Sequence, residues 1–308
     1  MKYIHGVSEF ELDRPSAVTL GKFDGVHRGH QKLISIVKQK AEEAELLSVL
    51  FTFDGIPLSI CPQKHQHFIT TNEERRKICE DLNLDVEIEY PFTTDFMNME
   101  PERFIADIIV KQMKAKVVVV GTDFCFGKDR AGNAEMLLEK GPEYGFDTVI
   151  VEKERYQERE ISSTYVREEL RLGHMETVNV LLDRPYSISG IVAKGQQLGR
   201  TIEVPTMNIY PREIKLLPPN GVYASISMIN GKPHFGITNL GTRPTVSDSM
   251  EISVETNIFD FAQEIYGEKV EVQLMHFLRP EMKFENIEGL KKQMETDTQF
   301  AREMFLLG

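Results

Sequence analysis

Residues 17–33 read AVTLGKFDGVHRGHQKL, an apolar run followed by a glycine-rich turn and the start of an amphipathic segment. The run 17–20 has the β-branched, unalternating character of a strand that is covered on both faces. Leu33 and Val37 then begin a stripe of apolar residues at helical spacing. This order of strand, glycine turn and helix is typical of the first unit of a doubly wound α/β sheet.

Further runs of the same kind continue this pattern through the N-terminal half. They lie at 48–53, 117–120 and 148–151, and a helical pattern covers 104–113. Parallel strands need crossover connections, which are usually helices. The alternation therefore predicts a parallel sheet with helices on its faces.

The pattern changes near Pro185, which disfavours continuation of the helical segment 167–182. Short alternating runs follow, punctuated by Gly, Asn and Pro, at 186–193, 222–229, 234–240, 252–259 and 270–277. The chain then ends with a helical pattern that includes Ile287 and Phe300. We predict two domains, 1–183 and 184–308, the second a small barrel or sandwich.

Composition limits the classes of partner. The 308 residues carry 36 Lys and Arg against 48 Asp and Glu, a net charge of −12, which argues against sequence-independent binding to nucleic acid. The sequence has neither a signal-peptide pattern at its start nor an apolar run long enough for a membrane helix. Cys61, Cys79 and Cys125 lack metal-ligand spacing and are expected to be reduced. The prediction is a soluble, cytoplasmic protein of unknown oligomeric state that binds neither nucleic acid nor membranes.

His27 and His30 flank Gly29 at the expected start of a helix. Free N–H groups and the helix dipole favour an anion at such a position. Two imidazoles there can stabilise negative charge on a phosphoryl group in transit. The alternative is that both histidines are polar turn residues without a catalytic role. A zinc site needs a third ligand and is usually marked by H-E-x-x-H, which is absent.

Three segments of the N-terminal half resemble one family. Residues 21–30, GKFDGVHRGH, are similar to the H-x-G-H signature of nucleotidyltransferases and, in their longer form, to bacterial bifunctional riboflavin kinase/FMN adenylyltransferases, also called FAD synthetases. Residues 161–167, ISSTYVR, resemble the I-S-S-T-x-x-R loop that grips ATP phosphates, although hydroxyl residues at a helix start are also ordinary caps. Residues 120–127, VGTDFCFG, resemble the V-G-x-D-F-x-F-G stretch, whose aromatic and acidic groups suit a flavin and a nucleotide.

The resemblance implies a Rossmann-like domain in which the phosphate of FMN attacks the α-phosphorus of ATP, giving FAD and pyrophosphate. It assigns catalytic roles to His27 and His30, which stabilise the transferring phosphoryl group, and to Arg167, which holds the leaving phosphates. It assigns binding of substrate or nucleotide to Gly21, Phe23, Asp24, Gly29, Asp123, Ser163 and Thr164. Mg²⁺ is the implied cofactor, with ATP and flavins as substrates.

In the C-terminal half, residues 205–208, PTMN, resemble the P-T-A-N signature of riboflavin kinases, which implies a small β-barrel kinase domain with a C-terminal helix. Thr206 and Asn208 lie two apart on an extended segment, so that a hydroxyl and an amide oxygen can ligate one Mg²⁺. Taken alone, this pattern is a common strand start. The resemblance makes Glu255 the general base for the riboflavin 5′-hydroxyl, and it assigns Gly199 to nucleotide binding.

Three positions depart from the kinase pattern. Glu203 stands where the family has glycine, adding bulk and negative charge to a loop near ATP phosphates. Met207 replaces alanine, and Lys194 stands where a histidine is common. Three interpretations therefore stay open: a bifunctional enzyme that makes FMN and then FAD, an FMN adenylyltransferase with a weak or inactive kinase module, and a non-catalytic flavin-binding regulator. A class I aminoacyl-tRNA synthetase shares H-x-G-H, but the acidic charge and the missing anticodon-binding domain disfavour it.

Overall fold

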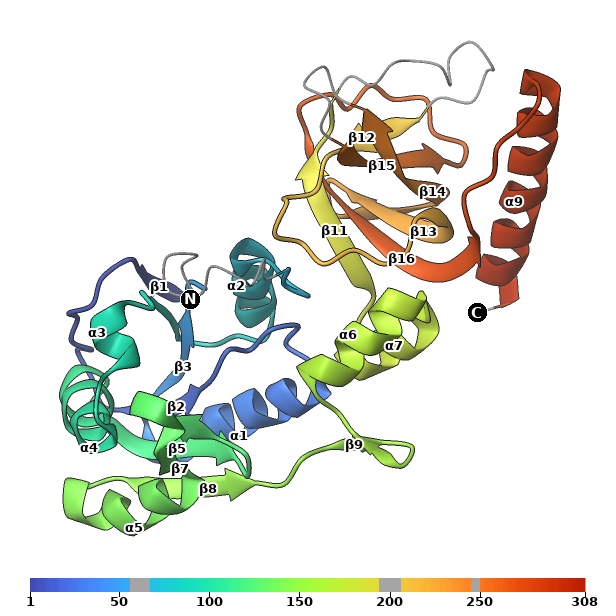
Figure 1. Ribbon diagram of the computed structural model, residues 1–308. Coiled ribbons are helices and arrows are strands. Elements are labelled where there is room, and N and C mark those ends of the chain that lie inside the picture. Colours follow the sequence, from blue (N-terminus) through green and yellow to red (C-terminus); the bar gives the residue numbers. More distant parts are fainter. Residues whose placement is uncertain (56–66, 194–205, 245–249, 308) are drawn as a thin grey trace. The chain divides into compact units, whose positions relative to one another are not determined.

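The computed structural model describes residues 1–55, 67–193, 206–244 and 250–307. The chain divides into two compact units, Met1–Ser163 and Thr164–Gly308 (Figure 1). The first unit is built on a parallel sheet and the second on an antiparallel sheet. The two fold classes expected from the sequence are therefore confirmed.

The first unit contains a six-stranded parallel sheet in the order β1-β4-β3-β2-β5-β8. Its strands are β1 (Lys2–His5), β2 (Ser16–Leu20), β3 (Leu47–Phe53), β4 (Val86–Tyr90), β5 (Ala115–Gly121) and β8 (Asp147–Val151). The chain runs outward from β2 to β3 and β4, and then returns to the other side of β2 with β5. The carboxyl ends of β2 and β5 therefore flank the switch point at which such sheets bind ligands.

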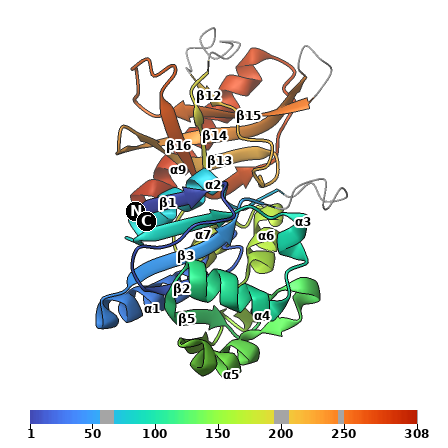
Figure 2. The ribbon, with the colours of Figure 1, turned by 90° about the vertical axis from the view of Figure 1, so that its left-hand side faces the viewer.

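Helices cover both faces of this sheet (Figure 2). On one face lie α1 (Arg28–Ala44) and α2 (Asn72–Asp81). Val37 of α1 packs with Ala17 and Val119, and Cys79 of α2 packs in a second cluster with Ile34 of α1. On the other face η1 (Phe104–Gln112) and α5 (Ala134–Tyr144) pack against the alternate strand residues, including Val18 and Val118. The connections carry α3 (Thr94–Met97), α4 (Pro101–Arg103), β6 (Cys125–Phe126), η2 (Lys128–Arg130), β7 (Gly132–Asn133), β9 (Arg155–Tyr156) and β10 (Arg159–Glu160).

The second unit contains a six-stranded antiparallel sheet in the order β11-β16-β13-β14-β15-β12. Its strands are β11 (Tyr186–Ile191), β12 (Met207–Ile209), β13 (Gly221–Ile229), β14 (Lys232–Pro244), β15 (Met250–Ile258) and β16 (Lys269–Arg279). The sheet curls on itself, because Ala193, just beyond β11, pairs with Asn208 on the opposite edge strand. The Ala193 N–H donates to the Asn208 carbonyl at 2.9 Å, which gives the sheet its barrel-like form.

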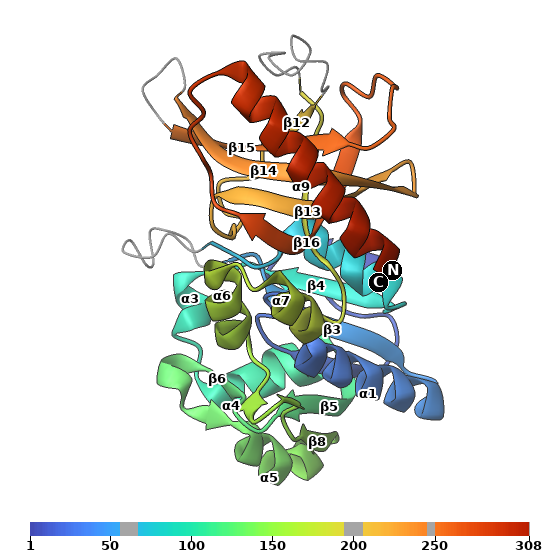
Figure 3. The same cartoon turned by 90° about the vertical axis from the view of Figure 1, so that its right-hand side faces the viewer.

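The C-terminal helix α9 (Ile287–Leu307) packs along this sheet, as Figure 3 shows. Ala301 is fully buried in a cluster with Val222 and Ala224 of β13 and Ile237 of β14. The predicted C-terminal helix is therefore part of the second unit. Within the described residues, no helix combines the length and the apolar character that a membrane span requires.

Two helices, α6 (Ser163–Leu172) and α7 (Met175–Leu182), replace the single helical segment expected over 167–182. They are separated at Gly173, whose φ of +76° is left-handed. The Asn179 side chain fastens α7 to two strands, since its Nδ2 donates to the Leu274 carbonyl at 3.1 Å and its Oδ1 accepts from the Tyr186 N–H at 2.7 Å. The boundary predicted at 183/184 thus lies within the second compact unit, and it stays a prediction for the limit of the kinase module.

We expect a fragment of residues 164–308 to be more stable than a fragment of residues 184–308. The shorter fragment lacks α7, which buries Met175, Val178, Leu181 and Leu182. Burying such side chains contributes about 1.5–3 kcal/mol each, so we expect the free energy of unfolding to fall by at least about 4 kcal/mol. Urea unfolding followed by circular dichroism measures the difference. Equal midpoints and equal slopes for both fragments would show that α7 does not stabilise this unit.

Candidate active sites

The turn between β2 and α1 has an unusual backbone. Phe23, Gly25 and Val26 have φ values of 48°, 86° and 39°, all in the left-handed region. For a bulky or β-branched residue this conformation is strained by about 1–3 kcal/mol. Phe23 and Val26 are nevertheless almost fully buried, and the Val26 N–H donates to the Phe23 carbonyl at 3.2 Å. The turn therefore depends on its surroundings to keep its shape.

His27 and His30 lie together at the first turn of α1. His27 is the N-cap, and its Nδ1 accepts a hydrogen bond from the His30 N–H at 3.4 Å. In a neutral imidazole this leaves the proton on Nε2 as a donor. The two rings stack with centroids 3.7 Å apart, and His30 also packs on Phe23 at 4.6 Å. The sequence prediction that both imidazoles share a helix N-terminus is thus confirmed geometrically.

Two of the predicted site glycines lie in close contact with aromatic or imidazole rings. A Cβ at Gly29 would lie 3.3 Å from Cε1 and Nδ1 of His27, so the imidazole would have to shift by a few tenths of an ångström. A Cβ at Gly21 would lie 3.1 Å from the ring of Phe23, and the Gly21 N–H donates to the Phe51 carbonyl at 3.1 Å. Both glycines therefore allow the turn to place its aromatic and imidazole rings.

The Asp24 carboxylate stabilises the turn through hydrogen bonds to a neighbouring segment. Its side chain is 7% exposed, and Oδ1 accepts hydrogen bonds from the N–H groups of Ile69 at 2.9 Å and Thr70 at 3.4 Å. Its carbonyl accepts from the Ser163 hydroxyl at 2.9 Å, which brings the two predicted motifs together. Direct nucleotide binding by Asp24 stays a prediction, because Asp24 is not among the residues that line the neighbouring cavity.

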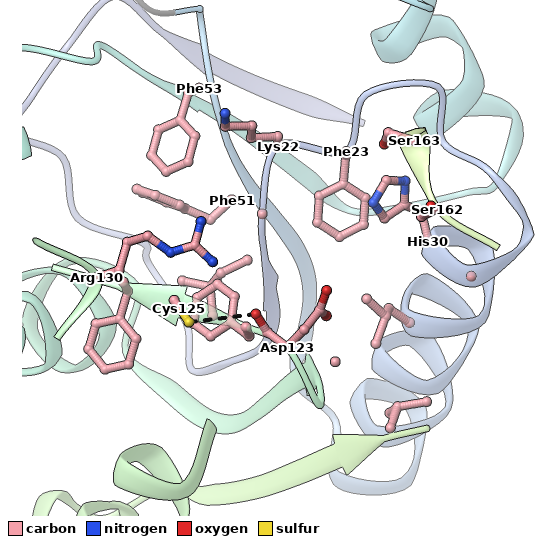
Figure 4. Close-up of a pocket in the computed structure, with 18 of the residues that line it drawn as sticks. Lys22, Phe23, His30, Phe51, Phe53, Asp123, Cys125, Arg130, Ser162 and Ser163 are labelled. Carbon is pink, nitrogen blue, oxygen red and sulfur yellow. Dashed lines mark hydrogen bonds between the residues drawn. The ribbon is translucent and has the colours of Figure 1, made fainter. Parts of the chain in front are cut away.

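A cavity of about 670 Å³ lies at the carboxyl ends of β2 and β5 (Figure 4). One end is polar and is lined by His27, Gly29, His30, Ser162 and Ser163. The other end is aromatic and is lined by Phe51, Phe53, Phe92, Phe96, Phe104, Phe124 and Phe126. Such an arrangement suits a ligand that joins a flat ring system to a phosphate chain.

Asp123 lies in this cavity just beyond β5 and forms an ion pair that the sequence analysis missed. Its Oδ2 is 3.1 Å from Lys153 Nζ, which is also 3.1 Å from Glu160 Oε2. Partial burial alone would lower the pKa of the Lys153 ammonium, but hydrogen bonds to the two carboxylates raise it above its ordinary value. Lys153 follows the predicted strand 148–151, so the rule that parallel strand ends meet at one edge could have identified it.

Three further side chains line the cavity without having been assigned a role. Cys125 is partly buried, and its Sγ donates weakly to the Asp123 carbonyl at 3.6 Å. In Figure 4, Arg130 lies on the same side of the cavity as Phe51, and Lys22 extends beside Phe53. The aromatic end is therefore bordered by cations. Cys125 lies on β6, Arg130 on η2 and Lys22 in the turn after β2, and no sequence pattern marks these three residues as neighbours.

Thr164 and Arg167 follow Ser163 on α6 and belong to the second compact unit. Arg167 is half-buried and Thr164 is exposed. Their predicted contact with ATP phosphates stays a prediction.

In the second unit, Asn208 and Glu255 face each other on adjacent strands. They are direct partners in the β12–β15 register, and Asn239 of β14 is the partner of Glu255 on its other side. Residues that are directly opposite point to the same face of a sheet, so these three side chains form one row. The sequence analysis identified Asn208 and Glu255 but did not single out Asn239.

Two polar contacts define this row. Asn208 is 5% exposed, and within the described part of the chain its Oδ1 is buried without a hydrogen-bond partner. Glu255 Oε1 accepts a hydrogen bond from the buried Ser253 hydroxyl at 3.2 Å. Thr206 precedes β12, and its carbonyl accepts from Asn208 Nδ2 at 3.4 Å. The predicted residues Gly199 and Glu203 lie outside the described residues.

Known proteins similar to this chain match it over nearly its whole length. A family model described as FAD synthetase matches residues 9–165, and one described as riboflavin kinase matches residues 182–305. A bifunctional riboflavin kinase/FMN adenylyltransferase from Listeria monocytogenes is 37% identical over 295 residues, covering 95% of this chain and 93% of the relative. A relative of the same description from Bacillus subtilis is 36% identical over 313 residues, covering 99% of this chain and 98% of the relative.

One solved structure is also similar over nearly the whole chain. It is the crystal structure of a protein from Streptococcus pneumoniae described as a macrolide-efflux protein, with a TM-score of 0.86 and 29% identity. The similarity covers 97% of this chain and 98% of that chain.

Proposed function

The chain belongs to the family of bifunctional riboflavin kinases/FMN adenylyltransferases, and we propose that its first unit adenylylates FMN to FAD while its second unit phosphorylates riboflavin to FMN. The observation that carries this proposal is the cavity in the first unit, which joins a pair of stacked imidazoles to an aromatic wall. ATP and flavins are the substrates. The proposal includes a cytoplasmic location, and the net charge of −12 argues against nucleic-acid partners.

For adenylyl transfer, an oxygen of the FMN phosphate attacks the α-phosphorus of ATP, and the bond to the β-phosphate oxygen breaks to release pyrophosphate. The aromatic end of the cavity would hold the flavin ring, leaving its phosphate toward the histidines. His27 Nε2–H and His30, with the N-terminus of α1, would donate to the phosphoryl oxygens as negative charge develops. Ser163, Thr164 and Arg167 are assigned to the leaving phosphates on the strength of their motif.

For riboflavin phosphorylation, Glu255 would accept the proton of the riboflavin 5′-hydroxyl as that oxygen attacks the γ-phosphate of ATP. The hydrogen bond from the Ser253 hydroxyl helps to orient the Glu255 carboxylate. Met207 does not obstruct this row, because strand alternation directs it to the opposite face from Asn208 and it is 7% exposed. The substitution of alanine by Met207 is therefore compatible with kinase activity.

Mg²⁺ fits the residues around Asn208. A buried amide oxygen without a hydrogen-bond partner is costly unless a ligand uses it, and carboxamide and hydroxyl oxygens are suitable Mg²⁺ ligands. Asn208 and Thr206 would hold the ion. Bound Mg²⁺ would neutralise part of the negative charge of the ATP phosphates.

The test is to incubate the purified protein with riboflavin, ATP and MgCl₂ and to follow the flavins by chromatography. We expect FMN to appear first and FAD to accumulate from it, and we expect excess chelator to stop both reactions. FAD formed only when FMN is supplied would show an adenylyltransferase with an inactive kinase unit. Flavin binding without either product would show a regulator.

A further inference from the structure

The strained turn 23–26 is held by the neighbouring residues Ile69 and Thr70, to which the proposed mechanism assigns no role. Thr70 is 5% exposed, and its hydroxyl accepts a hydrogen bond from the buried Gly25 N–H at 3.1 Å. Its own N–H donates to Asp24 Oδ1 at 3.4 Å. Ile69 adds a steric contact, since a Cβ built on Gly25 would lie 3.2 Å from two of its side-chain carbons. Ile69 and Thr70 therefore contact the turn at two successive residues, Asp24 and Gly25.

This segment is itself anchored to the sheet. Thr71 caps the start of α2 with a capping box. Its hydroxyl accepts a hydrogen bond from the Glu74 N–H at 3.2 Å, and its own N–H donates to the Glu74 carboxylate at 2.9 Å. One turn further on, the nearly buried Arg75 bonds Glu87 Oε1 of β4 at 3.0 Å and lies 3.2 Å from Glu89 Oε2. Thr70 thus sits at the start of a helix that cannot shift freely against the sheet.

The conformation of the turn 23–26 determines where His27 lies. Val26, in left-handed conformation, is followed directly by His27, whose Nδ1 caps α1 and whose ring lines the cavity. A non-glycine residue relaxes out of the left-handed region unless its neighbours prevent it. Loss of the bonds at Asp24 and Gly25 would let the turn relax and would displace the imidazole.

We propose that Thr70 is a positioning residue for FMN adenylylation: it holds the turn 23–26 in its left-handed shape and so places His27 at the phosphate end of the cavity. This inference rests on the adenylyltransferase function proposed above. Thr70 itself does not line the cavity, so it acts through the turn rather than on the substrate.

The test compares Thr70→Val, which keeps the shape but removes the acceptor, with Thr70→Ser, which keeps the acceptor. We expect Thr70→Val to lower kcat for FAD formation from FMN by about 10- to 100-fold, the usual effect of displacing a catalytic group by about 1 Å, with KM for ATP within about threefold. Thr70→Ser should restore kcat to within about threefold of the wild type. Riboflavin phosphorylation by the same preparations should be unchanged.

Thr148→Val is the matched control, because the Thr148 hydroxyl also bonds the backbone, donating to the Leu137 carbonyl at 2.9 Å, in the same unit but outside the cavity lining. We expect Thr148→Val to lower only the melting temperature. If Thr70→Val has the same effect and keeps its kcat, the positioning role is wrong. Thr70→Ser that is as slow as Thr70→Val also overturns it. Should Thr70→Val not fold, Thr70→Ala against Thr70→Ser makes the same comparison. A wild-type protein that forms no FAD would instead refute the proposed function.

Discussion

Replacing His30 with alanine is expected to lower the rate of FAD formation from FMN and ATP by at least about 10³-fold, while riboflavin phosphorylation changes by less than about twofold. Removing one preorganised donor to a developing oxyanion typically costs about 10²–10³ in rate. The ring of His30 also stacks on that of His27, with centroids 3.7 Å apart, and packs at a tilt against Phe23 at 4.6 Å, so its loss frees the remaining imidazole to move. The two effects act on the same step and reinforce each other.

The kinase reaction is the internal control for this variant. Glu255 and Asn208 belong to the second compact unit and His30 belongs to the first. Each unit has a hydrophobic core of its own, so the substitution leaves the kinase residues in place. Steady-state rates of FMN formation from riboflavin and of FAD formation from FMN, measured on one preparation, decide the result. If both rates fell in a folded protein, the assignment of one reaction to each unit would be wrong.

His5→Ala provides a matched second variant. His5 belongs to the same unit and stacks on Tyr3 with ring centroids 4.6 Å apart, the same separation as between His30 and Phe23. It is exposed on the edge strand β1 and does not line the cavity. We expect His5→Ala to keep both activities. A similar loss of FAD formation in His5→Ala would mean that removing a stacked imidazole anywhere in the unit is damaging.

The sequence predicted the sheet of the first unit only where its strands are apolar on both faces. The runs at 17–20, 48–53, 117–120 and 148–151 all became strands, because continuous β-branched residues leave few alternatives. Strand β4 was missed because its sequence, VEIEY, contains two glutamates, a residue type that usually lies on the surface. They are buried because Arg75 of α2 pairs with both, a contact that no local pattern encodes. Burial raises the pKa of Glu87 despite this partner.

The same distinction applies to the sites. His27 and His30 were predictable because they occupy a helix N-terminus after a central strand, which is a local feature. The role of Thr70 was not predicted, because it depends on a contact with Gly25, which is far away in the chain. Lys153 was overlooked although it follows a predicted strand, whose end lies beside that of β5 and Asp123. For Asp24 the motif predicted nucleotide binding, but in the structure its carboxylate accepts hydrogen bonds from the backbone N–H groups of Ile69 and Thr70, just before α2.

Replacing Glu255 with glutamine is expected to have the opposite effect to His30→Ala. Riboflavin phosphorylation should fall by about 10²–10⁴-fold, the usual contribution of a general base, while FAD formation from supplied FMN continues at the wild-type rate. Glutamine keeps the length of the side chain, and its amide oxygen can still accept from the Ser253 hydroxyl, but it cannot take the proton of the 5′-hydroxyl. The loss would therefore be chemical rather than structural.

Glu271→Gln is the control for this substitution. Glu271 is a half-buried acid on β16 of the same sheet, and it accepts a hydrogen bond from Gln273, two residues along its strand, at 3.0 Å. The geometry resembles that of Glu255 and Ser253, but Glu271 lies outside the row that contains Asn208. Wild-type kinase rates in Glu271→Gln would show that the loss is specific to position 255. An unchanged rate of riboflavin phosphorylation in Glu255→Gln would show that Glu255 is not the general base.

A mixture of the His30→Ala and Glu255→Gln variants tests whether FMN made by one chain can be used by another. Each is expected to retain the reaction that the other lacks, so a mixture of His30→Ala and Glu255→Gln, supplied with riboflavin and ATP, should accumulate FAD although neither variant does so alone. FMN would have to leave one chain and bind the cavity of another, at a rate that rises with the concentration of the second variant. If His30→Ala forms only about one FMN per chain and the mixture makes no FAD, FMN is not released from the kinase site.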